Sequence, residues 1–246
     1  MLTQPTIDKL YAMKLFAMAE AFRAQLADPN MAPLSFEERF GLIVDHQMTA
    51  MENRRLKNHL KNAHLRLSAT VEDIDFREGR GLNRSLIMSL SSNNWVRSHR
   101  NILVTGPTGA GKSFLACAFA QKACRDGNTT LYQRVPRLLE DIALARHDGR
   151  YHKVMDLLTK CEVLVLDDLF ITPVSHDEQK EILEIVEERY DRKATIVTSQ
   201  RPVKAWHEAM QDPTLADAIL DRLVHNSYKI ELPPNVETMR RRTTLD

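Results

Sequence analysis

ILVTGPTGAGKSFLACAFAQKAC, residues 102–124, decides the fold of this chain. An apolar β-branched run ends at Thr105, a glycine-rich loop follows, and a helical pattern begins at Phe114. The loop matches GxxxxGK[ST] between a strand and a helix, the arrangement in which backbone N–H groups cradle phosphates. We expect Lys112 to reach the β- and γ-phosphate oxygens and the Ser113 hydroxyl to ligate Mg²⁺. The predicted nucleotide-binding residues are Gly106, Pro107, Thr108, Gly109, Ala110, Gly111, Lys112, Ser113 and Phe114.

The second motif is acidic: VLVLDD at 163–168 consists of a buried strand that ends in two aspartates. The strand carries Asp167 to the carboxyl edge of the sheet, where it is expected to hold the metal through water. Asp168 is then the candidate to orient or deprotonate an attacking water, although it could instead cap the next turn. Because no NKxD-type guanine-reading motif follows, the pair of motifs favours ATP over GTP.

Two further residues complete the predicted catalytic set. Gln200 closes the strand TIVTSQ at the same sheet edge, where it could align the attacking water or belong to an ordinary strand-end turn. Arg222 lies on an amphipathic helix, 217–226, and could reach the γ-phosphate held by a neighbouring subunit. A surface ion pair is the commoner role of such an arginine.

Short β-rich runs alternate with helical stretches after Arg100, which predicts an α/β fold with a parallel five-stranded sheet between helices. The expected strands are Ile102–Thr105, Thr129–Gln133, Val163–Asp167, Thr195–Thr198 and Tyr228–Leu232. A small all-helical domain over 1–72 precedes this core and is expected to bind DNA and oligomerise. A linker and connecting helix over 73–98 and an ATPase domain over 99–246, which ends in a short basic tail, complete the predicted organisation.

The helical domain begins with an amphipathic stretch, Ile7–Leu26, whose apolar residues recur every three or four positions. A capping box at Ser35 and Glu38 then starts a long helix that we expect to run to Leu67. Arg54, Lys57 and Lys61 share one face of that helix. A solvated helix face is one explanation, and sequence-independent contact with DNA phosphates is the other. The candidate DNA-binding residues are Arg54, Arg55, Lys57, Lys61 and Arg66.

Amino-acid composition limits the kinds of binding site and the cellular location that the chain can have. The chain has 246 residues, with 34 Lys+Arg against 33 Asp+Glu, so any DNA site must be a local patch. Its three cysteines, Cys117, Cys124 and Cys161, show no metal-ligand spacing and are expected to be buried, reduced thiols. No secretion signal or membrane span is visible, and we expect a cytoplasmic protein.

The sequence resembles the IstB family, the helper ATPases encoded beside the transposase in a class of bacterial insertion sequences. GPTGAGKS, VLVLDD, TIVTSQ, FREGRGLNRSLI and DPTLADAILDRLVHNSYKIEL carry the resemblance, which covers nearly the whole chain. It implies an AAA+ core similar to the DnaC helicase loader, with Lys112 and Ser113, Asp167 and Asp168, Gln200 and Arg222 as motif residues, and Arg240 as a C-terminal sensor that contacts ATP. It also implies a bacterial ATPase that assembles on duplex DNA and stimulates the partner transposase, IstA.

The sequence departs from the family pattern at two places. Leu169-Phe170 follows the paired aspartates, where the family has an aromatic residue or Phe followed by Gly, and this difference could alter the turn beside the catalytic water. Thr238-Met239-Arg240 stands where the family has Ser-Met-Arg.

The sequence is consistent with three functions: a DNA-dependent transposition ATPase that forms homo-oligomers, a helicase loader, and a small-molecule kinase. The paired carboxylates suit activation of water better than phosphoryl transfer to a small acceptor.

Overall fold

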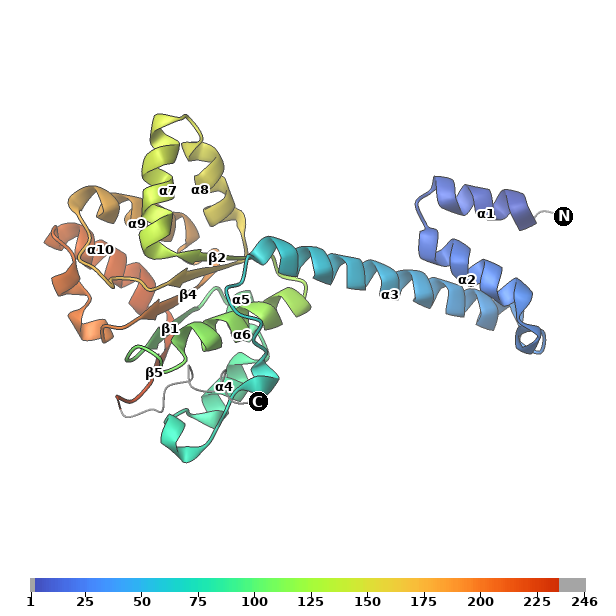
Figure 1. Ribbon diagram of the computed structural model, residues 1–246, viewed down its shortest axis with the longest axis horizontal. Coiled ribbons are helices and arrows are strands. Elements are labelled where there is room, and N and C mark those ends of the chain that lie inside the picture. Colours follow the sequence, from blue (N-terminus) through green and yellow to red (C-terminus); the bar gives the residue numbers. More distant parts are fainter. Residues whose placement is uncertain (1–2, 235–246) are drawn as a thin grey trace. The chain divides into compact units, whose positions relative to one another are not determined.

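The computed structural model describes residues 3–234 (Figure 1). The chain divides into two units, Met1–Asn58 and His59–Asp246, which we call the helical unit and the α/β unit. Helix α3 (Phe36–Ala63) begins in the helical unit and ends in the α/β unit. The division of the sequence at residues 72 and 98 stays a prediction.

The α/β unit is built on a parallel sheet of five strands in the order β2-β3-β4-β1-β5. The middle strands β3, β4 and β1 are buried along their whole length, as their continuous apolar sequences require. The predicted parallel sheet is confirmed, and each strand begins and ends within one residue of its predicted position. The strands are β1 (Asn101–Thr105), β2 (Thr130–Arg134), β3 (Val163–Asp167), β4 (Ala194–Ser199) and β5 (Ser227–Glu231).

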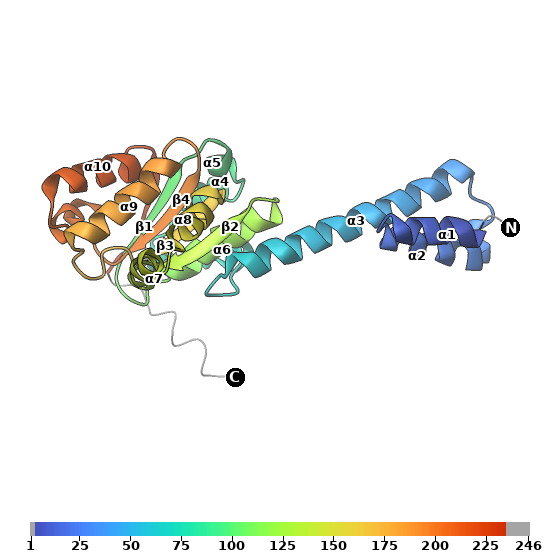
Figure 2. The same cartoon turned by 90° about the horizontal axis from the view of Figure 1, so that it is seen from above.

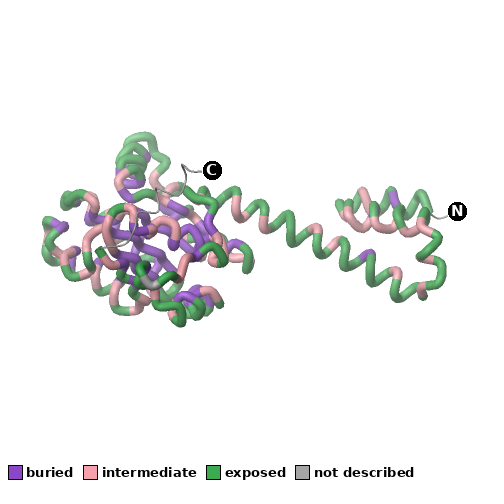
Figure 3. Tube along the Cα trace, turned by 60° about the horizontal axis from the view of Figure 1, so that its bottom comes forward, coloured by how far each residue is buried: buried purple, intermediate pink, exposed green. Residues whose placement is uncertain are grey.

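Helices cover both faces of the sheet (Figure 2). Successive strand residues point to opposite faces, so Ile102 and Val104 pack toward α4, α5 and α6, whereas Leu103 packs toward α7, α8, α9 and α10. In Figure 3 the buried segments gather in the interior of the α/β unit. The helices are α4 (Arg84–Leu90), α5 (Asn94–Arg97), α6 (Lys112–Arg125), α7 (Val135–His147), α8 (Tyr151–Lys160), α9 (His176–Arg189) and α10 (Pro213–Val224), with 3₁₀ turns at Val71–Asp73, Glu78–Arg80, Val203–Ala205 and His207–Ala209.

The helical unit contains α1 (Thr3–Ala12), α2 (Phe16–Ala27), a 3₁₀ turn (Pro29–Met31) and the first part of α3. The predicted capping box is present, since the Ser35 amide donates to Glu38 Oε2 at 2.8 Å and the Glu38 amide donates to Ser35 Oγ at 3.2 Å. Helix α2 is joined to α3 by the Met18 amide, which donates to Gln47 Oε1 at 3.0 Å.

Two predicted helix extents were wrong. The stretch Ile7–Leu26 is not one helix, because Lys14 adopts a φ of 62° and separates α1 from α2. Helix α3 ends at Ala63 instead of Leu67, because His64 has a φ of 51°. A left-handed residue ends a helix, and at these positions it is not the glycine by which sequence rules detect such an ending. Leu65, Arg66 and Leu67 consequently lie in an irregular segment.

Among residues 3–234 we find no helix that is both long enough and apolar enough to cross a membrane. The three cysteines are buried and form no disulfide, as expected for internal thiols.

Candidate nucleotide site

The P-loop connects the carboxyl end of β1 to the first turn of α6. Gly106, Gly109 and Gly111 have φ values of 145°, 85° and 101°, which residues with a Cβ rarely adopt. These turns wrap the loop over the amino end of α6, where backbone N–H groups are free of helical partners and attract anions. Lys112 is buried, and its Nζ donates to Pro107 O at 2.9 Å within the loop. The loop that is predicted to hold phosphates therefore wraps beside a buried cation.

Substitution of Gly106 by alanine is expected to distort this cradle. A Cβ at Gly106 would lie 2.8 Å from both the Cβ and the carbonyl oxygen of Leu232, and the φ of 145° would be strained. We expect a loss of about 1–3 kcal/mol in the free energy of unfolding, together with weaker ATP binding, measured by denaturant unfolding and by titration with a fluorescent ATP analogue. Gly41→Ala is the matched control because a Cβ there meets nothing within 4 Å. Equal stability of the two variants would contradict the prediction.

Asp167 is the buried centre of the site. Ser113 Oγ lies 2.9 and 3.0 Å from its two carboxylate oxygens, the Thr198 hydroxyl donates to Oδ1 at 2.5 Å, and the Tyr132 hydroxyl donates to Oδ2 at 2.5 Å. Burial and the hydrogen bond to Asp167 raise the pKa of Tyr132, so this hydroxyl stays protonated. The Ser113 hydroxyl and the Asp167 carboxylate converge as hard oxygen donors, which fits the ligand preference of Mg²⁺.

Asp168 lies beside Asp167 at the same sheet edge, with a φ of 61°. Its amide donates to Thr198 Oγ1 at 3.0 Å, so one threonine contacts both aspartates. The Asp168 carboxylate accepts a hydrogen bond from Arg134 Nε at 2.9 Å. Arg134 ends β2 and was not among the residues predicted from the sequence, because nothing in its local pattern marks it as a partner of a residue 34 positions later. The candidate base is thus held by an ion pair in this structure.

The turn after the paired aspartates is closed by Leu169 and Phe170, the residues that depart from the family pattern. Both are buried, and the Leu169 amide donates to Thr198 O at 2.9 Å. The Phe170 ring packs edge-on against the Trp206 ring, with 5.6 Å between the ring centroids. The Phe170 carbonyl accepts a hydrogen bond from Arg201 Nε at 3.0 Å. The turn is therefore fixed by packing on the core.

The structure brings Gln200 to the P-loop. Its Oε1 accepts from the Thr108 hydroxyl at 2.8 Å. A second P-loop contact was not predicted: the buried Arg80 donates through Nη2 to Ala110 O at 3.1 Å. The only sequence signal for Arg80 is its place in FREGRGLNRSLI, a stretch that contributes to the family resemblance.

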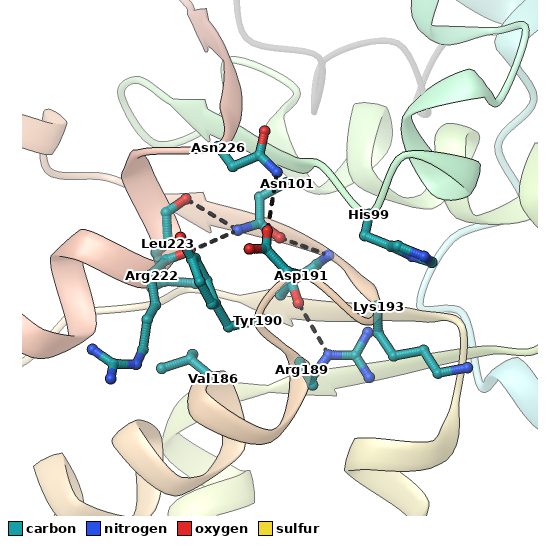
Figure 4. A pocket seen from close by; sticks show the side chains of 11 residues that line it. His99, Asn101, Val186, Arg189, Tyr190, Asp191, Lys193, Arg222, Leu223 and Asn226 are labelled. Atoms are coloured by element: carbon teal, nitrogen blue, oxygen red, sulfur yellow. Dashed lines mark hydrogen bonds between the residues drawn. The ribbon is translucent and has the colours of Figure 1, made fainter.

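Arg222 lies at the opposite end of the sheet from the P-loop. Asn101, the first residue of β1, donates to the carbonyls of Arg222 and Leu223, each at 3.2 Å, and its Oδ1 accepts from the Thr195 amide at 3.0 Å (Figure 4). The guanidinium of Arg222 forms an ion pair with Glu187 on α9 and donates to Ala218 O at 2.9 Å. Strand β1 has five residues and spans roughly 16 Å at about 3.3 Å per residue, so Asn101 lies one strand length from the loop. Arg222 is therefore not brought to the site in its own subunit.

The candidate DNA-binding residues fall into two groups. Arg54, Arg55, Lys57 and Lys61 are exposed on α3. Arg66 instead belongs to the segment after α3, where its Nη1 lies 3.6 Å from Asp167 Oδ2. Arg240 lies outside the described residues, as do Thr238 and Met239.

Comparison with known proteins gives a family and a fold. The family described as IstB-like ATP binding protein matches residues 8–246. A Sinorhizobium fredii protein assigned as an insertion-sequence ATP-binding protein is 46% identical over 98% of this chain and 98% of its own. The solved structure of DnaI has a TM-score of 0.59 at 22% identity, covering 68% of this chain and 92% of that one. The structure of the DnaC helicase loader has a TM-score of 0.57 at 17% identity, covering 67% and 97%.

The two structural likenesses support the AAA+ fold, and the sequence match spans both units. With the P-loop, the paired aspartates and the polar residue at the sheet edge in their expected places, the chain belongs to the IstB-like family of ATP-binding proteins.

Proposed function

We propose that this protein is an Mg²⁺-dependent ATPase that assembles as a homo-oligomer on duplex DNA and recruits or stimulates the partner transposase IstA of its insertion sequence. The family and the insertion-sequence relative support this context. One observation carries the assembly: Lys112, Ser113 and Asp167 converge at the carboxyl edge of the sheet, whereas Arg222 is anchored at the amino end of β1. A complete ATP site then needs an arginine from a second copy.

The chain's own residues divide the work. Lys112 and the P-loop amides bind the phosphates, and Ser113 and Asp167 would hold Mg²⁺, which supplies charge neutralisation on the phosphate oxygens when bound. Asp168 orients or deprotonates the attacking water once it leaves Arg134, and Gln200 lies beside the P-loop to position that water. Arg222 of a neighbouring subunit would stabilise charge on the transferred group.

Duplex DNA should contact the exposed cations of α3. Each neutralised phosphate releases counterions, and repetition of a small basic patch around an oligomer adds affinity by avidity. The decisive test is steady-state ATP hydrolysis with and without duplex DNA, at low and high salt, with sizing under the same conditions. DNA-raised turnover together with ATP-dependent assembly, both lost at high salt, is the expected result. A protein that stays monomeric and hydrolyses ATP at the same rate with and without DNA would overturn the proposal.

Lys112→Ala is expected to abolish this behaviour. Loss of the buried cation in the cradle should lower hydrolysis by about 10²-fold or more and prevent ATP-dependent oligomers on DNA, measured by sizing of the protein–DNA complex. Lys122→Ala, on the same helix but paired with Asp126, is the matched control and should behave as wild type. DNA-bound oligomers formed by Lys112→Ala with added ATP would contradict the proposal.

A helicase loader is the alternative, favoured by the fold shared with the DnaC helicase loader. It predicts a stable complex with a replicative helicase and little response of hydrolysis to DNA alone. Mixing the purified protein with the host replicative helicase before sizing separates the two functions.

A further inference from the structure

Arg66 stands on a segment that is fixed to the α/β unit. Leu65 packs against the core cluster on the α6 side of the sheet, and Ala69 and Ile74 are buried in it. Further along, Glu72 forms a two-point ion pair with Arg125 at the end of α6, with distances of 2.8 and 3.0 Å. The backbone that carries Arg66 is therefore held beside α6, and the position of its side chain follows from packing.

The guanidinium of Arg66 shares one oxygen with Tyr132. Arg66 Nη1 lies 3.6 Å from Asp167 Oδ2, the atom to which the Tyr132 hydroxyl donates at 2.5 Å. The Asp167 side chain is fully buried, whereas that of Arg66 is 50% exposed. The Asp167 side chain is therefore fixed by its surroundings, whereas the Arg66 side chain can move toward solvent.

A buried carboxylate is costly unless its charge is compensated. In this structure the hydroxyls of Ser113, Thr198 and Tyr132 donate to Asp167, but Arg66 supplies the positive charge. Mg²⁺ held by Ser113 and Asp167 would bring two positive charges to the carboxylate that Arg66 already compensates. Repulsion between cations that share one buried partner is substantial.

We propose that Arg66 is a positioning residue for the metal ligand: it neutralises Asp167 until Mg²⁺ arrives, and the two cations compete for that carboxylate. This inference rests on the proposed Mg²⁺-ATP site and goes beyond it, because it gives Arg66 a function separate from DNA contact. It predicts that the metal requirement is set partly by a residue outside the two nucleotide-binding motifs.

The test is an Mg²⁺ titration of the full chain at a fixed, subsaturating concentration of a fluorescent ATP analogue, without DNA. Removal of a half-exposed ion pair is a modest effect, so Arg66→Gln should lower the Mg²⁺ concentration at half-maximal binding about two- to fivefold. Arg66→Lys keeps the charge and should stay within about twofold of wild type. Lys160→Gln, which removes an exposed cation paired with Asp156 on α8, is the matched control and should not shift the midpoint.

Nucleotide binding in EDTA supplies the second readout. Arg66→Gln should leave this metal-free affinity unchanged, because Arg66 acts through Asp167 and not on phosphate. An unchanged or raised Mg²⁺ midpoint in Arg66→Gln, or equal shifts in the Gln and Lys variants, would overturn the inference while the proposed function stood. Absence of any Mg²⁺ dependence in the wild type would instead refute the proposed function and the inference together.

Discussion

Asp168→Asn is expected to lower the rate of ATP hydrolysis by about 10²- to 10⁴-fold, the usual contribution of a positioned general base. Asparagine has nearly the same shape, and the bond from the residue 168 amide to Thr198 Oγ1 does not involve the side chain. The local turn should therefore survive while the proton acceptor is lost. ATP binding should remain close to wild type, and DNA-bound oligomers should persist because ATP is not consumed.

Steady-state phosphate release, titration with a fluorescent ATP analogue and sizing on duplex DNA test these three expectations. Asp177→Asn is the control: its carboxylate is exposed in the first turn of α9 and pairs with Lys180. If Asp168→Asn hydrolysed ATP at the wild-type rate, Asp168 would not be the general base and would only form the turn and pair with Arg134. Loss of ATP binding would mean that the substitution disturbs Asp167 as well.

Arg222→Ala is expected to lower hydrolysis by about 10³-fold or more, as loss of an arginine that stabilises the transferred phosphoryl group does in related chemistry. In the proposed assembly this effect acts between subunits, because Arg222 is anchored to Asn101 at the end of β1 away from the P-loop. Arg222 must also leave its ion pair with Glu187 to reach a neighbour. Arg192→Ala, which removes an exposed arginine that lies in the turn after α9 and pairs with Glu188, is the matched control.

Mixing the two inactive variants distinguishes an intersubunit arginine from a structural one. An interface between an Asp168→Asn subunit that supplies Arg222 and an Arg222→Ala subunit that supplies Asp168 contains both groups, so the mixture should regain part of the wild-type rate. Each variant alone should stay inactive at the same total concentration. A mixture as inactive as its components, or normal hydrolysis by Arg222→Ala alone, would remove Arg222 from the catalytic set.

Local patterns in the sequence were sufficient for the core of this protein. The five strands could be placed within one residue because all are short and bounded by turns or helices, and because the three middle strands are mainly apolar runs. The P-loop could be predicted because its function requires fixed residue types at fixed spacing within eight consecutive positions. VLVLDD was recognisable for the same reason, and its register in the buried strand β3 places Asp167 at the sheet edge.

The ends of two helices could not be predicted, because they depend on left-handed backbone conformations at residues that are not glycine. Lys14 and His64 adopt left-handed conformations and end helices that the hydrophobic pattern would have continued. The second of these has a functional consequence. Because α3 stops at Ala63, Arg66 does not lie on the basic helix with Arg54 and Lys57, and its role as a DNA contact stays a prediction.

The partners of the two aspartates were decided only by the tertiary structure. Arg134 reaches Asp168, and Tyr132 and Arg66 reach Asp167, across sequence separations that no local pattern encodes. The sequence by itself determined the nucleotide loop, the strand order along the chain and the acidic pair, since these follow from short-range spacing. The folded sheet determined which side chains compensate the buried charge of Asp167, because parallel strands bring the ends of β2 and β3 together and packing on α6 fixes the segment that carries Arg66.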